Sequence, residues 1–113
     1  MELSGMETKR GYKVIAEFSI HPLGTGTSVS RYVKTAVREL RKAKGIRLMV
    51  TPMATVIEAD GVPQILKAVE AAHEALFKEG ATRVDFMLRI DDRRDKKRRM
   101  EDKIAAVSES RIS

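Results

Sequence analysis

Apolar and polar residues alternate along three stretches of the chain, at 12–23, 46–51 and 82–90. An alternation with a period of two is typical of a half-buried strand, which has one side on a core and the other facing outward. After Pro52 the alternation resumes from Thr55 to Glu58. Residues 48–59, rich in Val, Ile and Thr, therefore predict two short strands joined by a tight bend.

Apolar residues recur at helical spacing in two other stretches, from Val29 to Leu40 and from Leu66 to Phe77. Gly45 and Gly80 follow these stretches and are expected to end the two helices. A shorter helix is expected near the C-terminus from three apolar residues, Met100, Ile104 and Val107. Three such positions cannot stabilise a helix alone, so it must dock on this chain or on another.

The predicted order is β-α-β-β-α-β followed by a C-terminal helix. Two helices with apolar stripes need one sheet face to cover, which predicts a ferredoxin-like α+β fold with four antiparallel strands in the order 4-1-3-2. Residues 12–113 are expected to form this single domain, and residues 1–11, which show no periodicity, a frayed tail. Both helices then cover one face of the sheet and leave the other, here called the outer face, bare.

Two carboxylates, Glu17 and Glu58, are expected on the outer face, on strands that are neighbours in this order. Nearby carboxylates repel one another unless a cation, a proton or a basic residue offsets them. They can pair with Arg47, Arg83 or Arg89 on the same face, or they can recognise an amino-bearing or cationic ligand. Apolar residues on the same face favour packing against another subunit over a purely solvated surface. These residues are Ile15, Met49, Val56 and Met87.

Composition narrows the possible chemistry. The chain has no cysteine, which excludes disulfides, thiolate zinc sites and cysteine nucleophiles. The two histidines, His21 and His73, have no partners at the spacing of a metal site or a catalytic triad, so both are expected to be packing residues. No catalytic residue and no metal ligand is predicted. No apolar run approaches the roughly 20 residues that span a bilayer, and the N-terminus lacks a signal pattern, so a cytoplasmic protein is expected.

The charge balance raises the question of nucleic acid. The net charge is +6 and the isoelectric point about 9.8. However, residues 91–99 contain six basic and three acidic residues, and such a mixed run is more typical of a solvated loop. RNA-binding modules of this topology stack bases on outward-facing aromatics, whereas Phe18 and Phe86 fall on the inward side by alternation. Binding of nucleic acid is therefore not expected.

Several short segments carry a resemblance to a known family. They are Pro-Leu-Gly at 22–24, Ser-Val-Ser at 28–30, Thr-Pro-Met-Ala-Thr-Val-Ile-Glu at 51–58, Ile-Asp-Asp-Arg-Arg-Asp-Lys at 90–96 and Met-Glu-Asp-Lys at 100–103. In this order and spacing they resemble the small thiamine-binding protein family, over about residues 12–108. The resemblance implies a ferredoxin-like homotetramer, a dimer of dimers whose sheets pack on one another. It also implies binding of thiamine, or of its hydroxymethylpyrimidine portion, without turnover and without a cofactor.

Thiamine offers a positively charged thiazolium ring and an aminopyrimidine edge. A carboxylate can accept from the amino group and offset the charge, hydroxyls can add hydrogen bonds, and methionine can lie against a ring. The expected ligand-binding residues are Glu17, Ser19, Ser28, Thr51, Met53, Thr55 and Glu58. The expected oligomer interface comprises Met49, Val56, Met87, Arg93, Arg94 and Asp95. In that interface the alternating Asp and Arg residues of 91–96 would form ion pairs between subunits.

Two residues depart from the family pattern, because Ala54 and Ala59 stand where Gly is usual. If the position of Ala54 requires a positive φ, the hairpin bends differently and a pocket beside it becomes narrower. Three alternatives to a small-molecule binder stay open: an RNA-binding module, a structural oligomer without a small ligand, and an enzyme of thiamine or pyrimidine metabolism.

Overall fold

The computed structural model describes residues 13–27 and 29–112, with side chains as far as residue 108. The expected tail at 1–11 and the candidate ligand residue Ser28 lie outside the described residues. The elements are, in order, β1 (Val14–Pro22), α2 (Ser30–Lys42), β2 (Ile46–Val50), β3 (Thr55–Ala59), α3 (Val62–Lys78), β4 (Val84–Asp92) and α4 (Met100–Ile112).

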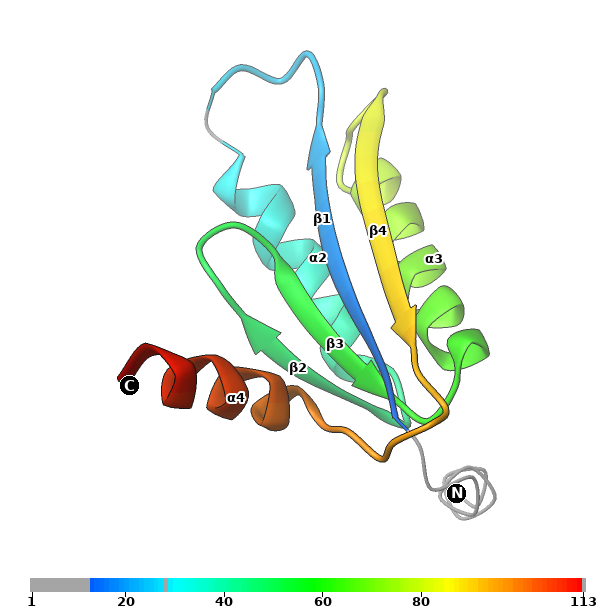
Figure 1. Ribbon diagram of the computed structural model, residues 1–113. Coiled ribbons are helices and arrows are strands. Elements are labelled where there is room, and N and C mark those ends of the chain that lie inside the picture. The colour runs from blue at the N-terminus through cyan, green and yellow to red at the C-terminus, as the bar shows by residue number, and fades with distance from the viewer. Residues whose placement is uncertain (1–12, 28, 113) are drawn as a thin grey trace.

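The four strands form one antiparallel sheet in the order β2-β3-β1-β4 (Figure 1). This is the 4-1-3-2 order expected for a ferredoxin-like fold, so the predicted fold class is confirmed. β1 is central, and all nine of its residues pair with β4, from Val14 with Asp92 to Pro22 with Val84. β2 and β4 are the two edge strands.

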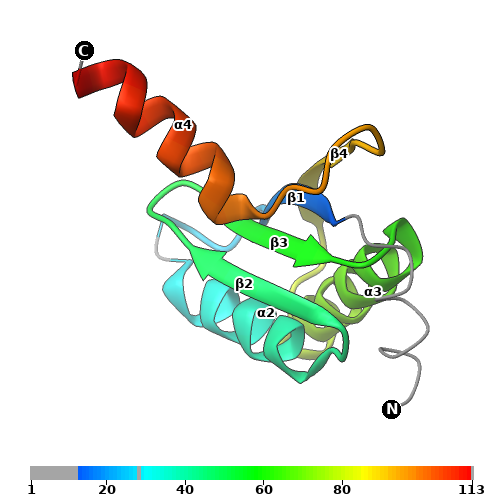
Figure 2. The same cartoon turned by 60° about the horizontal axis from the view of Figure 1, so that its bottom comes forward.

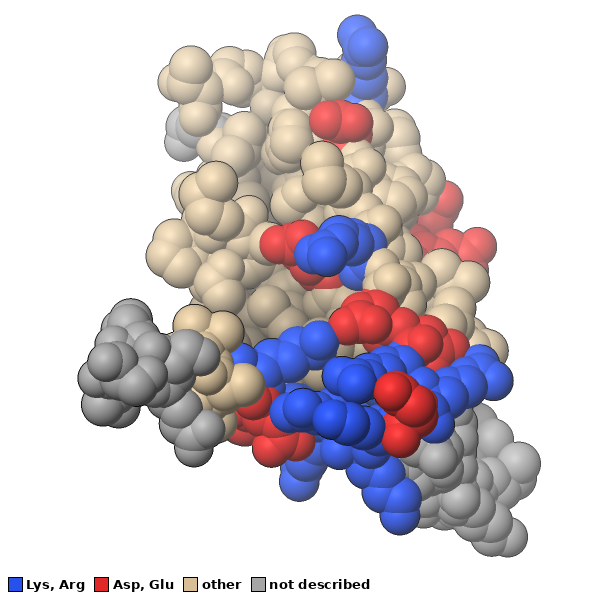
Figure 3. Space-filling view, viewed as in Figure 1, with Lys and Arg blue, Asp and Glu red and all other residues tan. Residues whose placement is uncertain are grey.

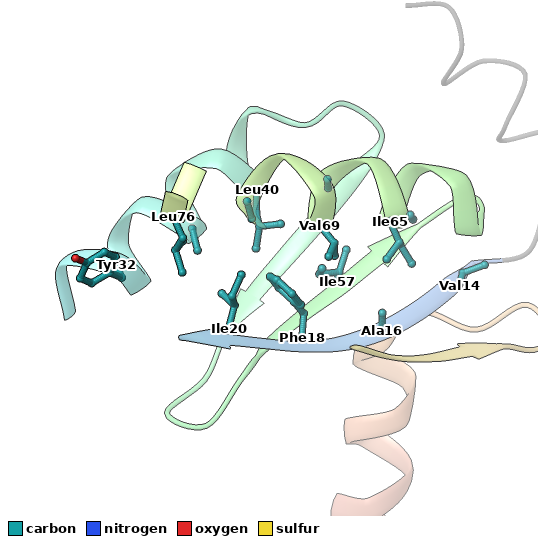
Figure 4. Packing of buried hydrophobic residues seen from close by; sticks show 14 of the residues in the cluster. Val14, Ala16, Phe18, Ile20, Tyr32, Leu40, Ile57, Ile65, Val69 and Leu76 are labelled. Atoms are coloured by element: carbon teal, nitrogen blue, oxygen red, sulfur yellow. The ribbon is translucent and has the colours of Figure 1, made fainter. Parts of the chain in front are cut away.

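The core lies between the sheet and the pair α2 and α3, which cover the same face (Figure 4). Alternate residues of β1 point into it, and Phe18 at its centre is 2% exposed. α2 presents Tyr32, Ala36 and Leu40 to the sheet, and α3 presents a stripe at the same spacing. Because aromatic residues are scarce, aliphatic side chains fill most of this layer.

Two glycines with a positive φ lie after the core helices, and Gly80 directly follows the C-cap residue of α3, Glu79, as expected. The prediction that Gly45 ends α2 was wrong, because α2 ends at Lys42 with an extended Ala43 and Gly45 lies in the turn before β2. Gly45 follows α2 with a φ of 78°, and Gly80 follows α3 with a φ of 119°. Residues with a Cβ atom rarely adopt a positive φ, which is why Gly is common at such positions.

α4 projects away from the rest of the domain (Figure 2). Its first residue, Met100, is buried, but every described side chain from Glu101 to Val107 is exposed. In particular, Ile104 is 51% and Val107 65% exposed. The predicted apolar stripe therefore docks on this chain only at its first residue. Among the described residues, no helix is long and apolar enough to cross a membrane.

Candidate functional site

The outer face is organised in rows that cross the strands. One row runs from Arg47 on β2 through Glu58 on β3 and Ile15 on β1 to Asp91 on β4. The next row towards the hairpin between β2 and β3 runs from Met49 through Val56 and Glu17 to Arg89. Glu17 and Glu58 are thus diagonal neighbours on adjacent strands, as expected from the sequence.

The two carboxylates have different surroundings. Glu58 is only 3% exposed, and its oxygens accept hydrogen bonds from Arg47 Nε at 2.9 Å and from the backbone N–H of Met100 at 3.0 Å. Arg99 Nε lies 3.9 Å from the same carboxylate. A buried carboxylate needs such compensation, because burying it alone is costly. The sequence left two alternatives for Glu58, pairing with an arginine of the same face or recognition of a ligand. The structure contains the ion pair with Arg47.

Arg47 joins Glu58 to the first turn of α4. Its Nη2 donates to both carboxylate oxygens of Glu101, at 2.7 and 2.6 Å. The hydrogen bond to Glu101 is the main reason why the pKa of Arg47 is raised, and the same bond lowers the pKa of Glu101. A further contact joins Lys103 Nζ to Asp91 at 2.7 Å, and it lowers the pKa of Asp91. The start of α4 is therefore held on the outer face by charged groups.

Glu17, in contrast, is open to solvent. Its side chain is 55% exposed, and its ion-pair contact is with Arg89 Nη1 at 3.9 Å. At this distance and exposure the pair contributes little to stability. Glu17 is thus an acidic residue of the outer face that can exchange its partner at small cost.

Charged side chains gather at one end of this face, over the start of α4 and the segment before it (Figure 3). The other end, near the hairpin, is mostly uncharged (Figure 3). Within residues 92–95 the ion pairs are local: Arg93 Nε contacts Asp95 at 2.6 Å, and Arg94 Nη2 contacts Asp92 at 2.9 Å. An intersubunit role for Arg93 and Arg94 would require these aspartates to be shared or exchanged.

A hollow of about 140 Å³ lies beside the hairpin, between the end of β1 and α2. It forms because β3 begins at Thr55, opposite Phe18, so beyond Phe18 no strand among the described residues pairs with this side of β1. Its lining is mainly apolar and includes Val33 and Val37 of α2. Four of the expected ligand residues also line it, namely Ser19, Thr51, Met53 and Thr55. Glu17 and Glu58 do not line it.

The hairpin that borders this hollow is tied by Thr51. The Oγ1 of Thr51 donates to the carbonyl of Ala54 at 2.7 Å and accepts from the N–H groups of Met53 and Ala54 at 3.3 and 3.1 Å. Among the described residues only glycines have positive φ, so Ala54 fits its position without backbone strain. The position of Ala54 therefore does not require a positive φ, and the hairpin can bend there without Gly.

A second groove of about 350 Å³ runs along the free edge of β2 against α2. Leu40 and Val50 line both this groove and the hollow beside the hairpin. Sequence reasoning missed the α2 side of this site. The signal was available, because Val33 and Val37 extend the apolar stripe of the helix towards the strand edge.

No group of three or more His, Cys, Asp or Glu side chains within the described residues is arranged to hold a metal ion. His73 packs edge-on against Phe77 and Phe86, with ring centroids 5.1 and 5.8 Å apart. His21 lies 3.6 Å from Asp85 at the exposed end of β1.

Comparison with known proteins establishes the family. Residues 16–108 match the profile of the family described as thiamine-binding protein. The chain belongs to the thiamine-binding protein family. This confirms the resemblance stated from the short segments.

The relatives of this thiamine-binding family member span most of its length. A UPF0045 protein of Methanothermobacter thermautotrophicus is 43% identical over 97 residues, covering 85% of this chain and 97% of the relative. The UPF0045 protein YqgV of Bacillus subtilis is 44% identical over 98 residues, covering 83% and 93%. The crystal structure of hypothetical protein MJ1052 from Methanocaldococcus jannaschii has a TM-score of 0.78 at 41% identity, covering 86% of this chain and 97% of that one.

Proposed function

We propose that the protein binds thiamine or a related aminopyrimidine, without turnover, at a site completed by a second copy of the chain. The family supports the ligand class, since residues 16–108 match a family described as thiamine-binding. The observation that carries the proposal is the hollow beside the hairpin, which is lined by Ser19, Thr51, Met53 and Thr55.

The size of the hollow supports a shared site. Pockets for small ligands usually measure about 300–1,000 Å³. One chain provides about 140 Å³ beside the hairpin. A second copy packed against the outer face would supply the missing walls and exclude water from a bound pyrimidine ring.

Glu17 supplies the charge that a cationic ligand needs. It lies on the outer face two residues before Ser19, which places the two Cα atoms about 7 Å apart along the strand. A ring held in the hollow could therefore extend its amino group or its positive ring towards Glu17. Ser28 and Glu58 complete the proposed set of ligand residues, and Glu58 would first have to exchange a partner.

The assembly proposed for this site is a homotetramer, a dimer of dimers whose outer faces pack together. Met87 is 68% exposed on that face, where Met49 and Val56 are half-buried. Exposed apolar residues that adjoin one another mark surfaces that bind other molecules. In this proposal Met49, Val56 and Met87 form the sheet contact, while Arg93, Arg94 and Asp95 form its charged rim.

A thermal-shift titration tests the ligand. A ligand that binds only the folded state stabilises it by about 2.7 kcal/mol at a concentration 100 times its Kd. We expect thiamine and hydroxymethylpyrimidine to raise the Tm, and calorimetry to give saturable heats without product. Glu17→Gln should weaken thiamine binding, whereas Glu74→Gln, an exposed change on α3, should leave it unchanged. An unchanged Tm with both compounds, or formation of a product, would contradict the proposal.

A second candidate is a structural oligomer with no small ligand. The saturation of Glu58 by Arg47 and Met100 favours it, because the more buried of the two acids already has partners in its own chain. The same titration separates the candidates, since an oligomer without a ligand would show no shift. RNA binding has less support, because Phe18 is buried and the outward positions of the four strands carry no Phe, Tyr or Trp.

A further inference from the structure

The helix that lines the hollow beside the hairpin carries much of the positive charge of the chain. α2 has five basic residues and one acidic residue, a net charge of +4 out of +6 for the whole chain. Two of the five are paired: Arg31 Nε lies 3.2 Å from Glu79, and Lys42 Nζ lies 2.8 Å from Glu39. By helical spacing both lie on the side of α2 that is opposite to the hollow.

The other three basic residues form one stripe. Lys34, Arg38 and Arg41 follow one another at spacings of four and three residues, which places them on one side of α2. All three are exposed, and none of them makes an ion pair with another residue that the structure describes. Like charges at this spacing slightly destabilise a helix, so the stability of α2 does not explain the stripe. A bound anion would offset the repulsion.

The stripe borders the hollow. Val37, which lines the hollow, lies three residues after Lys34 and four residues before Arg41. Side chains at these spacings are neighbours on a helix, with Cβ atoms about 5–6 Å apart. The described residues that line the hollow include no Asp or Glu. Two cations without an ion pair therefore flank the α2 wall of the hollow.

The hollow itself presents apolar side chains to solvent. Val33, Val50 and Met53 all line it, and they are 40%, 50% and 87% exposed. Apolar lining of this kind accepts a ring, whereas lysine and arginine beside it attract an anion. A ligand that matches both surfaces has a flat, mainly apolar ring with an anionic group on a short link.

Phosphate is the anion that fits this arrangement best. A phosphate monoester carries nearly two negative charges and three terminal oxygens, which is enough to engage two cations at once. The Cα atoms of Lys34 and Arg41 are about 10.5 Å apart along the helix, and both side chains are long enough to meet a phosphate over Val37. Arg41 also lines the groove of about 350 Å³ along β2, which leaves room for the phosphate beside the hollow.

We propose that Lys34 and Arg41 form a phosphate subsite beside the hollow, and that the ligand of this site is the phosphate ester of an aminopyrimidine. This inference rests on the proposed function, because the hollow supplies the place of the ring. It deepens that function by naming a class of ligand, since the subsite favours a phosphorylated pyrimidine over the free alcohol. Thiamine has no phosphate and is a cation, so it gains nothing from the two basic residues.

Calorimetry with hydroxymethylpyrimidine and with its phosphate ester tests the subsite. We expect the ester to bind about tenfold more tightly than the alcohol at low salt, because charge-assisted hydrogen bonds hold its phosphate. This advantage should shrink as the salt concentration rises, since exposed charges are screened. Inorganic phosphate, which lacks the ring, should bind at least about tenfold more weakly than the ester, because it gains nothing from the apolar lining.

Charge-neutralising variants test the two residues. Lys34→Gln or Arg41→Gln should weaken binding of the ester about threefold or more, and the double variant should abolish its advantage over the alcohol. Affinity for the alcohol should stay the same, and thiamine should bind no more weakly. Lys67→Gln is the matched control, because it removes the same charge from an exposed position on α3 and should keep the advantage. Circular dichroism should show that every variant is folded, since all three positions are exposed.

Loss of the advantage in the double variant, with the alcohol still bound, would support the proposal. Equal affinity of the parent chain for the ester and the alcohol would overturn the subsite but leave the proposed function in place. Tight binding of the ester by the double variant would have the same meaning. If the ester, the alcohol and thiamine all failed to bind, the subsite and the proposed function would both be wrong.

Discussion

Glu58 connects the sheet to the C-terminal helix through one carboxylate. One oxygen accepts from Arg47 of the neighbouring strand, and the other accepts from the first N–H of α4. A carboxylate at the N-terminus of a helix also complements the helix dipole. The residue therefore contributes to structure whether or not a ligand ever reaches it.

Replacing Glu58 by Gln should destabilise the protein. The amide keeps one acceptor but places an NH₂ group towards either Arg47 or the N–H of Met100, and the buried partner that it faces loses its bond. We expect a loss of about 1–3 kcal/mol in the free energy of unfolding, measured by urea denaturation. Glu17→Gln, on the exposed neighbour, should change it by less than about 0.5 kcal/mol. Equal stability of the two variants would show that Glu58 does not hold α4.

Part of this residue's environment could be predicted from the sequence. The alternation of β3 places Glu58 on the outer face, and Arg47 was among its three expected partners. The bond to Met100 could not be predicted, because it depends on where α4 docks 42 residues later in the chain. Burial of Glu58 could not be predicted for the same reason, since a bare sheet face would have left it exposed.

The hairpin between β2 and β3 depends on one hydroxyl group. Thr51→Val removes three hydrogen bonds to the bend and keeps the shape of the side chain. We expect a loss of about 1–2 kcal/mol in the free energy of unfolding and faster amide exchange at Met53 and Ala54. Thr51→Ser keeps the hydroxyl, so in this variant the amides of Met53 and Ala54 should exchange as slowly as in the parent chain. If Thr51→Val were as stable as Thr51→Ser, packing rather than hydrogen bonding would hold the bend.

The docking of α4 should depend on pH. Hydrogen bonds from Arg47 and Lys103 lower the pKa of Glu101 and of Asp91 from their ordinary values of 4.5 and 3.8. A carboxyl whose pKa is lowered by folding contributes stability that is present above its unfolded pKa and is lost as the pH falls through its folded pKa. We therefore expect α4 to stay docked at neutral pH and to detach as the pH falls below about 4.

Amide chemical shifts from Met100 to Val107, followed by NMR during an acid titration, would measure this detachment. Glu101→Gln provides the control, because it removes one titrating group and weakens docking at neutral pH. The amide chemical shifts of this variant should change less between pH 7 and 3 than those of the parent chain. Identical titration curves would show that the contact between Arg47 and Glu101 does not contribute to docking.

At the scale of the whole molecule, the sheet order followed from the sequence because each strand shows a period of two and each core helix a period near 3.6. Phe18 and the other inward residues of β1 are buried as their alternation predicts. Phe86 of β4 is 42% exposed, and this incomplete cover could not be predicted in this way. Alternation assigns a side chain to a face, but it does not say how far the neighbouring helix reaches over an edge strand.

The exposed stripe of α4 gives the last prediction. A helix of 13 residues with one buried end is marginal in water, so Ile104 and Val107 should pack against another copy in the assembled protein. Replacing both by Ser removes apolar contact from that surface but touches nothing buried in the single chain. We expect the mass in light scattering to fall by at least half. The free energy of unfolding of the core, measured by urea denaturation with the amides of β1 and α3 as probes, should change by less than about 0.5 kcal/mol. Ala105→Ser, on a different side of α4, should keep the parent mass. If the double variant also kept it, α4 would have to be stabilised by its charged first turn alone, and its amides beyond Lys103 should then exchange rapidly even in the assembly.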